Sequence, residues 1–169
     1  FVGMWHTNVD LYPGNITKQY DMSFIGNKNN QRISMENMFK QNNLDVRFFS
    51  GLSHEDMVTT HAKSKIGLNF SMNTNSTPPR TQMKARMFEV PAANTVLLTE
   101  YHDGIEEYFE IDKEILTFKS EQEMLEKFKA IIGKDSIIKE IAKNGYNRFI
   151  KEHESKVRLS NVLDKIKKF

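Results

Sequence analysis

Residues 65–71 read KIGLNFS, a short and mainly apolar run that ends in polar side chains. A run of this length and composition predicts a strand that is buried on both faces of a sheet. Similar runs predict strands at 22–26, 46–51, 95–101 and 114–118, and amphipathic helices separate them. Strands that alternate with helices are typical of a parallel sheet with helices on both sides. The sequence therefore predicts an α/β fold, a doubly wound parallel sheet of about five strands.

Capping residues indicate where several of the helices begin and end. Ser53 and Ser120 each stand three residues before an acidic residue, which is the spacing of a capping box. After Ser120 the apolar residues recur at helical spacing as far as Gly133, which ends that helix. Two more helices are expected, over 136–151 and across 159–166. The chain should therefore close with three helices.

Composition limits the class of protein. The 169 residues fit one domain, and 38% hydrophobic with 27% charged residues is typical of a soluble globular chain. No apolar run reaches the ~20 residues that cross a bilayer, so no transmembrane segment is expected, and peripheral membrane association stays open. The lack of cysteine favours a reducing compartment, so we expect a cytoplasmic protein. Because the chain begins at Phe1, we interpret it as part of a longer protein, with 1–19 an interdomain connection or edge segment and 20–169 the domain.

The charge distribution favours a small anion over a nucleic acid as the partner. A net charge of +2 is too small to indicate nucleic-acid binding, so none is expected. Residues 57–88, however, contain five basic side chains and no acidic one. Such a run could bind an anion.

The predicted sheet indicates where a ligand would lie. In an open parallel sheet, ligands bind beyond the carboxyl ends of the strands. The candidate contacts are therefore the residues that follow the first, third and fourth of the central strands. They are Asn27 and Arg32, then Asn69 and Arg80, and finally Tyr101, Asp103 and Gly104.

A helix that opens near Thr81 is expected to carry further contacts. At ~100° per residue, Gln82, Arg86 and Glu89 would share one polar face. In this interpretation Lys84 or Arg86 neutralises a phosphate, and Glu89 accepts hydrogen bonds from sugar hydroxyls. The alternative is an exposed ion pair between Arg86 and Glu89 on a solvated helix, worth ~0.3 kcal/mol.

Other chemistries lack their signatures in this sequence. No Gly-x-Gly-x-x-Gly or Gly-Lys-Ser/Thr loop follows a strand, which argues against dinucleotide-binding dehydrogenases and P-loop enzymes. The five histidines show no metal-ligand spacing, and we expect His61 to be a packed side chain. Glu110 and Asp112 are interpreted as surface residues. Serine occurs without a nucleophile elbow.

Several motifs together resemble group 1 glycosyltransferases, and among them the spore-protein-like branch (spore maturation protein B type). They are YDMSFIGN at 20–27 with Arg32, SKIGLNFS at 64–71, QMKARMFEVPAA at 82–93, LLTEY at 97–101 and GIEEYF at 104–109. IAKNGY at 141–146 and the pair 152–153 with Arg158 complete the resemblance. These motifs cover most of the chain from Tyr20 onward.

The resemblance implies the carboxyl-terminal, Rossmann-like domain of a GT-B enzyme, which holds the nucleotide-sugar donor. It implies that Glu89 contacts the ribose and that Lys84 and Arg86 act as the catalytic residues beside the diphosphate, without a metal ion or other cofactor. The chain departs from the family pattern in two places. Thr81 stands where many group 1 enzymes have a second glutamate, and Asn94 stands where a glycine is usual.

The function expected from the resemblance is transfer of a sugar, as in hexosyltransferases, from a nucleotide-diphosphate donor to an acceptor. A missing amino-terminal domain would hold that acceptor, so this chain alone should be inactive. One alternative is a non-catalytic Rossmann-like interaction module that has lost donor binding and acts through its basic carboxyl-terminal helices. Another is a flavodoxin-like or regulator-like domain, but Gly26 and Asn27 occupy the place of the phosphoacceptor aspartate.

Overall fold

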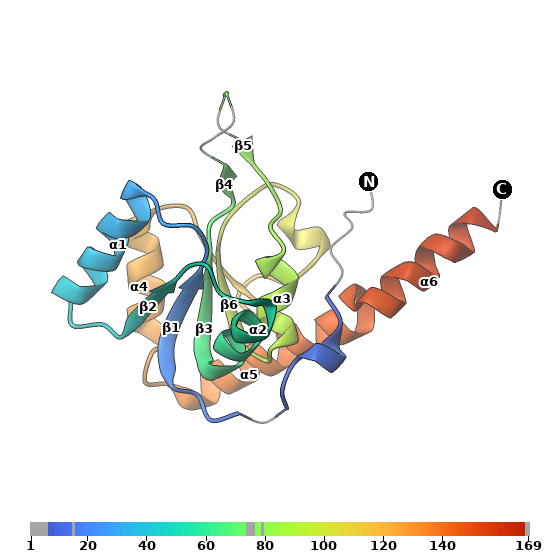
Figure 1. Cartoon of the computed structure of the whole chain (residues 1–169), viewed down its shortest axis with the longest axis horizontal. Helices are drawn as coiled ribbons and strands as arrows, with labels where there is room; N and C mark the ends of the chain where they lie inside the picture. The colour runs from blue at the N-terminus through green and yellow to red at the C-terminus, as the bar shows by residue number, and fades with distance from the viewer. Residues whose placement is uncertain (1–6, 15, 74–76, 79, 168–169) are drawn as a thin grey trace.

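Five parallel strands form the central sheet of the computed structural model, which describes residues 7–14, 16–73, 77–78 and 80–167 (Figure 1). The strands are β1 (Tyr20–Ile25), β2 (Val46–Phe49), β3 (Ser64–Asn69), β6 (Val96–Glu100) and β7 (Leu116–Phe118). Their order is β2-β1-β3-β6-β7, so the direction of chain progress reverses between β1 and β3. The predicted strands and the doubly wound α/β fold are confirmed.

Helices cover both sides of this sheet. They are α1 (Asn30–Gln41), α2 (His54–Lys63), α3 (Arg86–Ala92), α4 (Glu121–Ile131), α5 (Asp135–Arg148) and α6 (Ser155–Ile166). Short turns η1 (Val9–Leu11), η2 (Ile105–Glu107) and η3 (Phe149–His153) lie between or before them. The hydroxyls of Ser53 and Ser120 cap α2 and α4, each accepting a backbone N–H three residues on, as predicted. The three closing helices are also confirmed.

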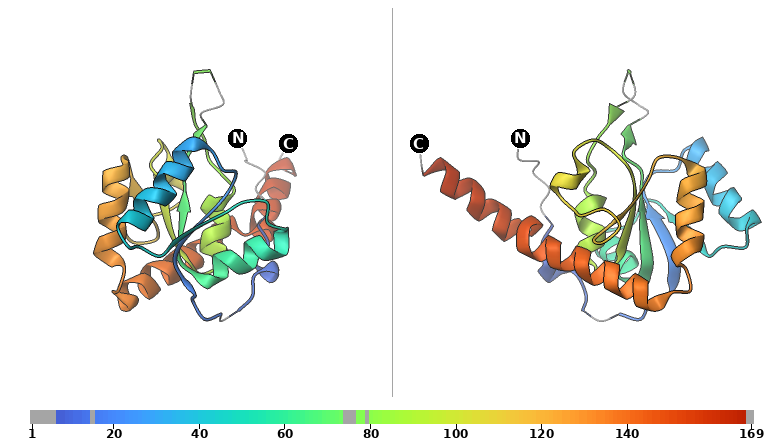
Figure 2. Two further views of the ribbon diagram at one scale, coloured as in Figure 1. Left: turned by 60° about the vertical axis from the view of Figure 1, so that its left-hand side comes forward. Right: turned by 180° about the vertical axis from the view of Figure 1, so that it is seen from behind.

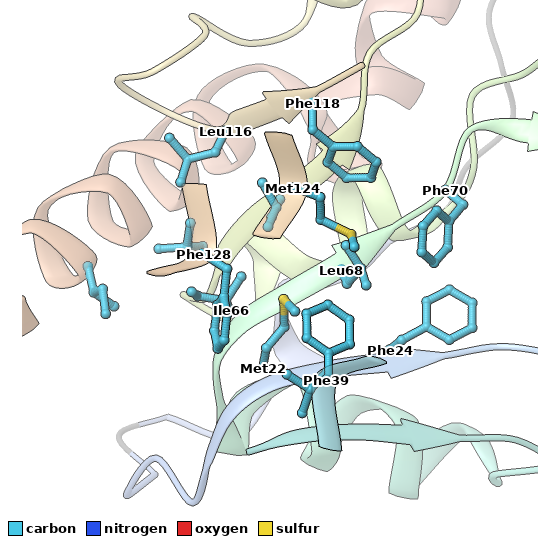
Figure 3. Close-up of a cluster of buried hydrophobic side chains, with 14 of the residues drawn as sticks. Met22, Phe24, Phe39, Ile66, Leu68, Phe70, Leu116, Phe118, Met124 and Phe128 are labelled. Atoms are coloured by element: carbon cyan, nitrogen blue, oxygen red, sulfur yellow. The ribbon is translucent and has the colours of Figure 1, made fainter. Parts of the chain in front are cut away.

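The larger core lies on the side of the sheet that α1 and α4 cover. Alternate residues of the strands point there because side chains of a strand alternate between its two faces. Met22 and Phe24 of β1 meet Ile66 and Leu68 of β3, together with Phe39 of α1 (Figure 3). All five are at most 1% exposed. This packing fixes where β1 and β3 end.

A second core forms on the opposite side, beneath α3. Met87, Phe88 and Val90 of α3 pack there with Leu97 of β6 and Phe149 of η3. All five are fully buried, so the apolar stripe of α3 anchors this short helix to the sheet. Asn94, just after α3, has a φ of 51°, which confirms that asparagine can replace glycine in this turn.

The predicted helix start near Thr81 is wrong. Thr81 belongs to the strand β5 (Arg80–Thr81), which pairs antiparallel with β4 (Met72–Asn73). The backbone N–H of Gln82 then donates to the carbonyl of Ser71 at 2.9 Å. These cross-hairpin bonds engage the backbone just before the helix, so α3 begins only at Arg86. The hairpin projects beyond the carboxyl ends of the sheet (Figure 1).

The opening segment and α6 lie together at one side of the molecule. Ser155 donates its backbone N–H to the carbonyl of Thr7 at 3.1 Å, and Lys156 pairs with Asp10 at 2.8 Å. From there α6 extends away from the sheet (Figure 2). Within the residues that the structure describes, no helix combines the length and apolarity needed to cross a membrane.

Candidate functional site

Arg86 marks the centre of the candidate site, between the carboxyl ends of β1 and β3. Its Nη1 donates to the carbonyl of Ile25, the last residue of β1, at 2.7 Å. Its Nε donates to Oδ1 of Asn69, the last residue of β3, at 3.1 Å. The strand order reverses here, and ligands of open α/β sheets bind at such a reversal. The first residue of α3 is therefore fixed where a ligand is expected.

Arg32 and Lys84 add positive charge around Arg86. The guanidinium of Arg32 lies 4.8 Å from the ring centre of Phe24, and that of Arg86 lies 5.0 Å from the same ring. Arg32, in α1, also donates to the backbone carbonyl of Asn27. We call Arg32, Lys84 and Arg86 the cationic cluster.

The pKa values of the cluster reflect its crowding. Burial lowers the pKa of Arg86 to about 10, with the charge of Glu89 opposing this shift and the nearby Arg32 adding to it as a smaller cause. Burial, with Arg86 and Arg32 as neighbouring cations, also lowers the pKa of Lys84. Like charges held together disfavour one another unless an anion is present. An anionic ligand would therefore stabilise this cluster.

Glu89 lies one turn after Arg86 in α3 and is also partly buried. Burial raises the pKa of its carboxyl, and the positive charges of Arg86 and His54 oppose that rise. The exposed Arg86–Glu89 ion pair considered as an alternative is wrong, because both side chains are partly buried and Arg86 bonds to the strand ends. Tyr12, from the opening segment, lies near Glu89, and its pKa is raised by burial and by the Glu89 charge.

Asn69 and Gly26 keep the cationic cluster in its place at the strand ends. Asn69 is fully buried, and both the nitrogen and the oxygen of its amide have partners, because Nδ2 donates to Oγ1 of Thr99 at 2.9 Å while Oδ1 accepts from Arg86. It therefore positions Arg86 and is out of reach of a ligand. At Gly26, a Cβ would lie 2.8 Å from the Phe24 ring and 3.3 Å from Arg86, so a side chain there would displace the cluster.

The remaining predicted contacts follow the carboxyl ends of β3 and β6 along the chain. Arg80 is exposed on the projecting hairpin, and Gln82 is exposed between that hairpin and α3. Tyr101 follows β6, stacks against Lys119 at 4.5 Å, and has its pKa raised mainly by a hydrogen bond with Glu106. Asp103 is exposed, and Gly104 adopts a φ of 84° before η2.

Sequence reasoning missed Glu100, which holds the loop after β3. Its carboxylate accepts the backbone N–H groups of Ser71 and Met72 at 2.8 and 2.7 Å, and its carbonyl accepts the hydroxyl of Ser71. The signal available in the sequence was a glutamate at the end of a buried strand, where a carboxylate needs donors. Tyr12 and His54, beside Glu89, were also missed.

Within the ranges that the structure describes, no group of three or more histidine, aspartate or glutamate side chains is placed to hold a metal ion. Glu110 is exposed and pairs with Lys113 at 2.5 Å, which confirms its surface position. The candidate site is a cluster of three basic side chains with the carboxylate of Glu89 nearby.

Comparisons with known proteins agree with this geometry. A family model described as glycosyl transferase-like matches residues 15–164. No curated protein sequence matches the chain significantly. Among solved structures, sucrose-phosphate synthase from Thermosynechococcus elongatus aligns with a TM-score of 0.71 at 13% identity, over 96% of this chain and 51% of that one.

Two further structures show which part of such proteins the chain matches. Anabaena HepE, in complex with UDP and glucose, aligns with a TM-score of 0.71 at 9% identity, over 97% of this chain and 56% of that one. The carboxyl-terminal domain of a group 1 glycosyl transferase, LpcC from Francisella tularensis, aligns with a TM-score of 0.62 at 13% identity, over 88% of this chain and 98% of that one. The chain therefore spans about half the length of the two longer proteins, and its fold is the Rossmann-like, carboxyl-terminal half of a GT-B enzyme.

Proposed function

Because the chain belongs to the glycosyl transferase-like family, we propose that it binds a nucleotide-diphosphate sugar and serves as the donor-binding half of a glycosyltransferase. The proposal rests on the hydrogen bonds that hold Arg86 to the last residues of β1 and β3, at the reversal of strand order. The diphosphate would lie against the cationic cluster. Assignment to the spore-protein-like branch stays a prediction.

The cationic cluster suits a diphosphate both in charge and in geometry. Two of the five guanidinium N–H groups of Arg86 bind Ile25 and Asn69, which leaves the others for ligand oxygens. A guanidinium that is already held in place loses little conformational freedom when it binds a phosphate. Lys84 and Arg32 supply further positive charge. Among the described residues, no carboxylate lies within ion-pair distance of either side chain.

Glu89 is proposed to receive the hydroxyl groups of the ribose. Glu89 lies three residues after Arg86 in the same short helix, so the two side chains leave the same face of α3. A carboxylate with a raised pKa is poorly solvated, so it gains from hydrogen-bond donors that a ligand brings. This predicts that donor binding favours the ionised form of Glu89.

The transfer step would use the cluster to stabilise the leaving group. The bond between the anomeric carbon and the phosphate oxygen breaks, and its electron pair remains on that oxygen. The acceptor oxygen bonds to the anomeric carbon and gives up its proton to a base that the amino-terminal domain would supply. Arg86 and Lys84 would neutralise the charge that grows on the departing diphosphate, a role that a metal ion has in other enzymes.

The rest of the catalytic centre is proposed to come from a separate domain. Two of the matched structures are about twice as long as the aligned region, whereas the third is itself a carboxyl-terminal domain. We propose that an amino-terminal domain holds the acceptor and that this chain alone binds donor without turnover. Because the sequence lacks cysteine, we propose a cytoplasmic location.

Calorimetry with nucleoside diphosphates tests the donor site. UDP is the first ligand to use because HepE has been crystallised with UDP and with UDP-glucose, and ADP and GDP test the base. Titrations with and without EDTA decide whether a metal ion contributes. We expect at least one nucleoside diphosphate to bind in the presence of EDTA. A folded chain that binds none of them would refute the proposal.

The interaction-module alternative has one observation in its favour. Leu159, Leu163 and Ile166 of α6 are 59%, 47% and 63% exposed, and they lie within two turns of one helix. Such a stripe is typical of a surface that packs against another protein. A donor site filled by Phe70 would also favour this alternative, but Phe70 packs against Phe24 and Phe118 in the core. The calorimetric result separates the two functions.

A further inference from the structure

A cavity lies at the amino-terminal ends of the strands, at the opposite end of the sheet from Arg86. Its volume is about 690 Å³, large enough for a small organic molecule. The segment around Lys18 forms one wall, the turn after α3 forms another, and the first half of α5 forms the third. The donor site does not use any of these residues.

Lys18 is a partly buried cation in the wall of this cavity. Its Nζ donates to the carbonyl of Asn94 at 3.0 Å and to Oγ1 of Thr95 at 2.9 Å. Within the described ranges, no carboxylate lies within ion-pair distance of it. An ammonium group has three N–H donors, so one is left for a ligand. A buried cation without a negative partner is costly, and an anion in the cavity would offset that cost.

The other charged residues of the cavity are also mainly basic. Lys139 and Lys143 are exposed on α5 and line it. Lys65 lines it too, but pairs with Asp21 at 3.0 Å and with Asp135 at 3.8 Å. Asp135, the only acidic residue described in the lining, is thus already near a lysine. Three lysine charges face the cavity without a matching carboxylate.

Apolar surface completes the cavity. Ala62 at the end of α2, Ala93 after α3 and Ile138 of α5 contribute to the lining. An inorganic ion would leave this surface wet, whereas an organic group would cover it. A monocarboxylate would neutralise only one of the three lysines. The lining therefore fits an ester that carries a doubly charged phosphate on a small apolar body.

We propose that this cavity binds a small phosphomonoester, with the phosphate at Lys18 between Lys139 and Lys143 and the organic group against Ala62, Ala93 and Ile138. The phosphate accepts the remaining N–H of Lys18. The same chemistry occurs in soluble phosphomonoesters and in the headgroup of phosphatidate. The site is independent of the proposed donor site.

Calorimetric titration with phenyl phosphate tests the proposal, with benzyl alcohol as a neutral probe of similar size. We expect phenyl phosphate alone to bind, and Lys18→Met to weaken it about tenfold because a charged hydrogen bond is lost. Lys113→Met is the matched control, since that exposed lysine pairs with Glu110 away from the cavity. Arg86→Met separates the two sites, because it removes the phosphate partner of the proposed donor site and leaves the cavity intact, so phenyl phosphate should still bind to this variant.

A double variant keeps the test decisive if Lys18→Met does not fold. Lys139→Met with Lys143→Met changes only exposed side chains and should also weaken binding about tenfold. A wild-type chain that does not bind phenyl phosphate overturns the proposal. So does binding that Arg86→Met abolishes and the cavity variants leave intact, because the ligand would then occupy the donor site.

Two further measurements locate the ligand and its source. Burial lowers the pKa of Lys18 to about 8, so its amine should react with acetic anhydride faster than exposed lysines at pH 8, and phenyl phosphate should suppress that reaction.

Co-sedimentation with phosphatidate and with phosphatidylcholine vesicles tests the lipid source. If the chain associates with phosphatidate vesicles and Lys18→Met abolishes this association, the ligand is the lipid headgroup. If the chain binds phenyl phosphate but does not associate with the vesicles, the ligand is a soluble ester. Association that survives Lys18→Met counts against the cavity.

Discussion

Nε of Arg86 lies 3.1 Å from Oδ1 of Asn69, and the same amide donates to Oγ1 of Thr99 at 2.9 Å. A row of polar side chains therefore runs from β6 through β3 to the first residue of α3. Asn69 and Thr99 are fully buried, so their hydrogen bonds are protected from water. The row orients the guanidinium before any ligand arrives.

Replacing Arg86 by methionine should weaken nucleoside diphosphate binding about tenfold to a hundredfold, because charge-assisted hydrogen bonds to phosphate are lost. Arg47→Met is the matched control. Arg47 is exposed on β2 and pairs with Asp45 at 2.7 Å, so this change should leave binding unaltered. Calorimetry measures both. Equal affinities in the two variants would show that Arg86 has no contact with the nucleotide.

The position of Asn69 could be predicted from sequence, but its role could not. A polar residue at the end of an apolar run indicates the ligand-binding edge of a parallel sheet, and Asn69 lies there. Whether its amide meets a ligand or another side chain depends on Thr99 and Arg86, which lie 30 and 17 residues away. Sequence patterns indicate where strands end and which residues share a face of a helix. They do not indicate hydrogen bonds between side chains that lie far apart in the chain.

At two other places the structure differs from the sequence prediction because residues far apart in the chain pair with each other. Thr81 was assigned to a helix because a polar and apolar period continues through it, but backbone pairing with Met72 outweighs that period. Tyr12 lies near Glu89, yet 77 positions separate them, and the segment around Tyr12 has no periodicity. Strands and helix caps were predictable because adjacent residues determine them.

Glu89→Gln should make the ligand-free chain more stable at pH 7 and weaken donor binding. Burial raises the pKa of Glu89 in the folded state, so the folded chain binds that proton more tightly than the unfolded chain. Its contribution to stability is full below pH 4.5 and is lost as pH rises through the folded pKa. Glutamine imitates the protonated form. The melting temperature at pH 7 should rise by about 2–4 °C for each kcal/mol gained.

The effect of Glu89→Gln should vanish near pH 4, where the wild-type carboxyl is itself protonated. Glu126→Gln is a suitable control, since Glu126 is exposed on α4. Thermal denaturation at pH 4 and pH 7 compares the three proteins. A Glu89→Gln chain that melts lower than wild type at pH 7 would mean that the ionised carboxylate stabilises the fold.

His61 should make the chain sensitive to acid. Its ring is 1% exposed, and neither ring nitrogen has a hydrogen-bond partner among the described residues. Burial, with Arg86 and Lys18 as further causes, lowers its pKa to about 3. Between pH 6.5 and 3 the unfolded chain therefore binds more protons. Stability should fall with pH across that range, by at most about 1.4 kcal/mol per unit from this residue.

His61→Leu should reduce this acid sensitivity, because leucine has no proton to bind and no ring nitrogen to leave unsatisfied. His54→Leu provides the comparison, since His54 is exposed at the start of the same helix. Urea denaturation at pH 4, 5, 6 and 7 gives the free energy of unfolding of each variant. The same slope against pH in wild type and His61→Leu would exclude His61 as the cause.

Gly67 allows α3 to approach the sheet, so it should control the site from a distance. A Cβ at Gly67 would lie 2.6 and 2.7 Å from the two methyl groups of Val90, far inside a normal contact. Gly67→Ala should therefore destabilise the chain by about 1–3 kcal/mol through overpacking. It should also weaken nucleotide binding, because α3 carries both Arg86 and Glu89.

The double variant Gly67→Ala with Val90→Ala tests this explanation, since it removes the methyl groups that the new Cβ would meet. Val90→Ala alone should cost stability by leaving a cavity in a fully buried position. If α3 is displaced by the contact, the two changes together should cost less than the sum of the single changes, and nucleotide affinity should return toward wild type. Simple additivity of the two free energies would show that Gly67 matters for another reason, such as strand conformation, and that α3 stays in place.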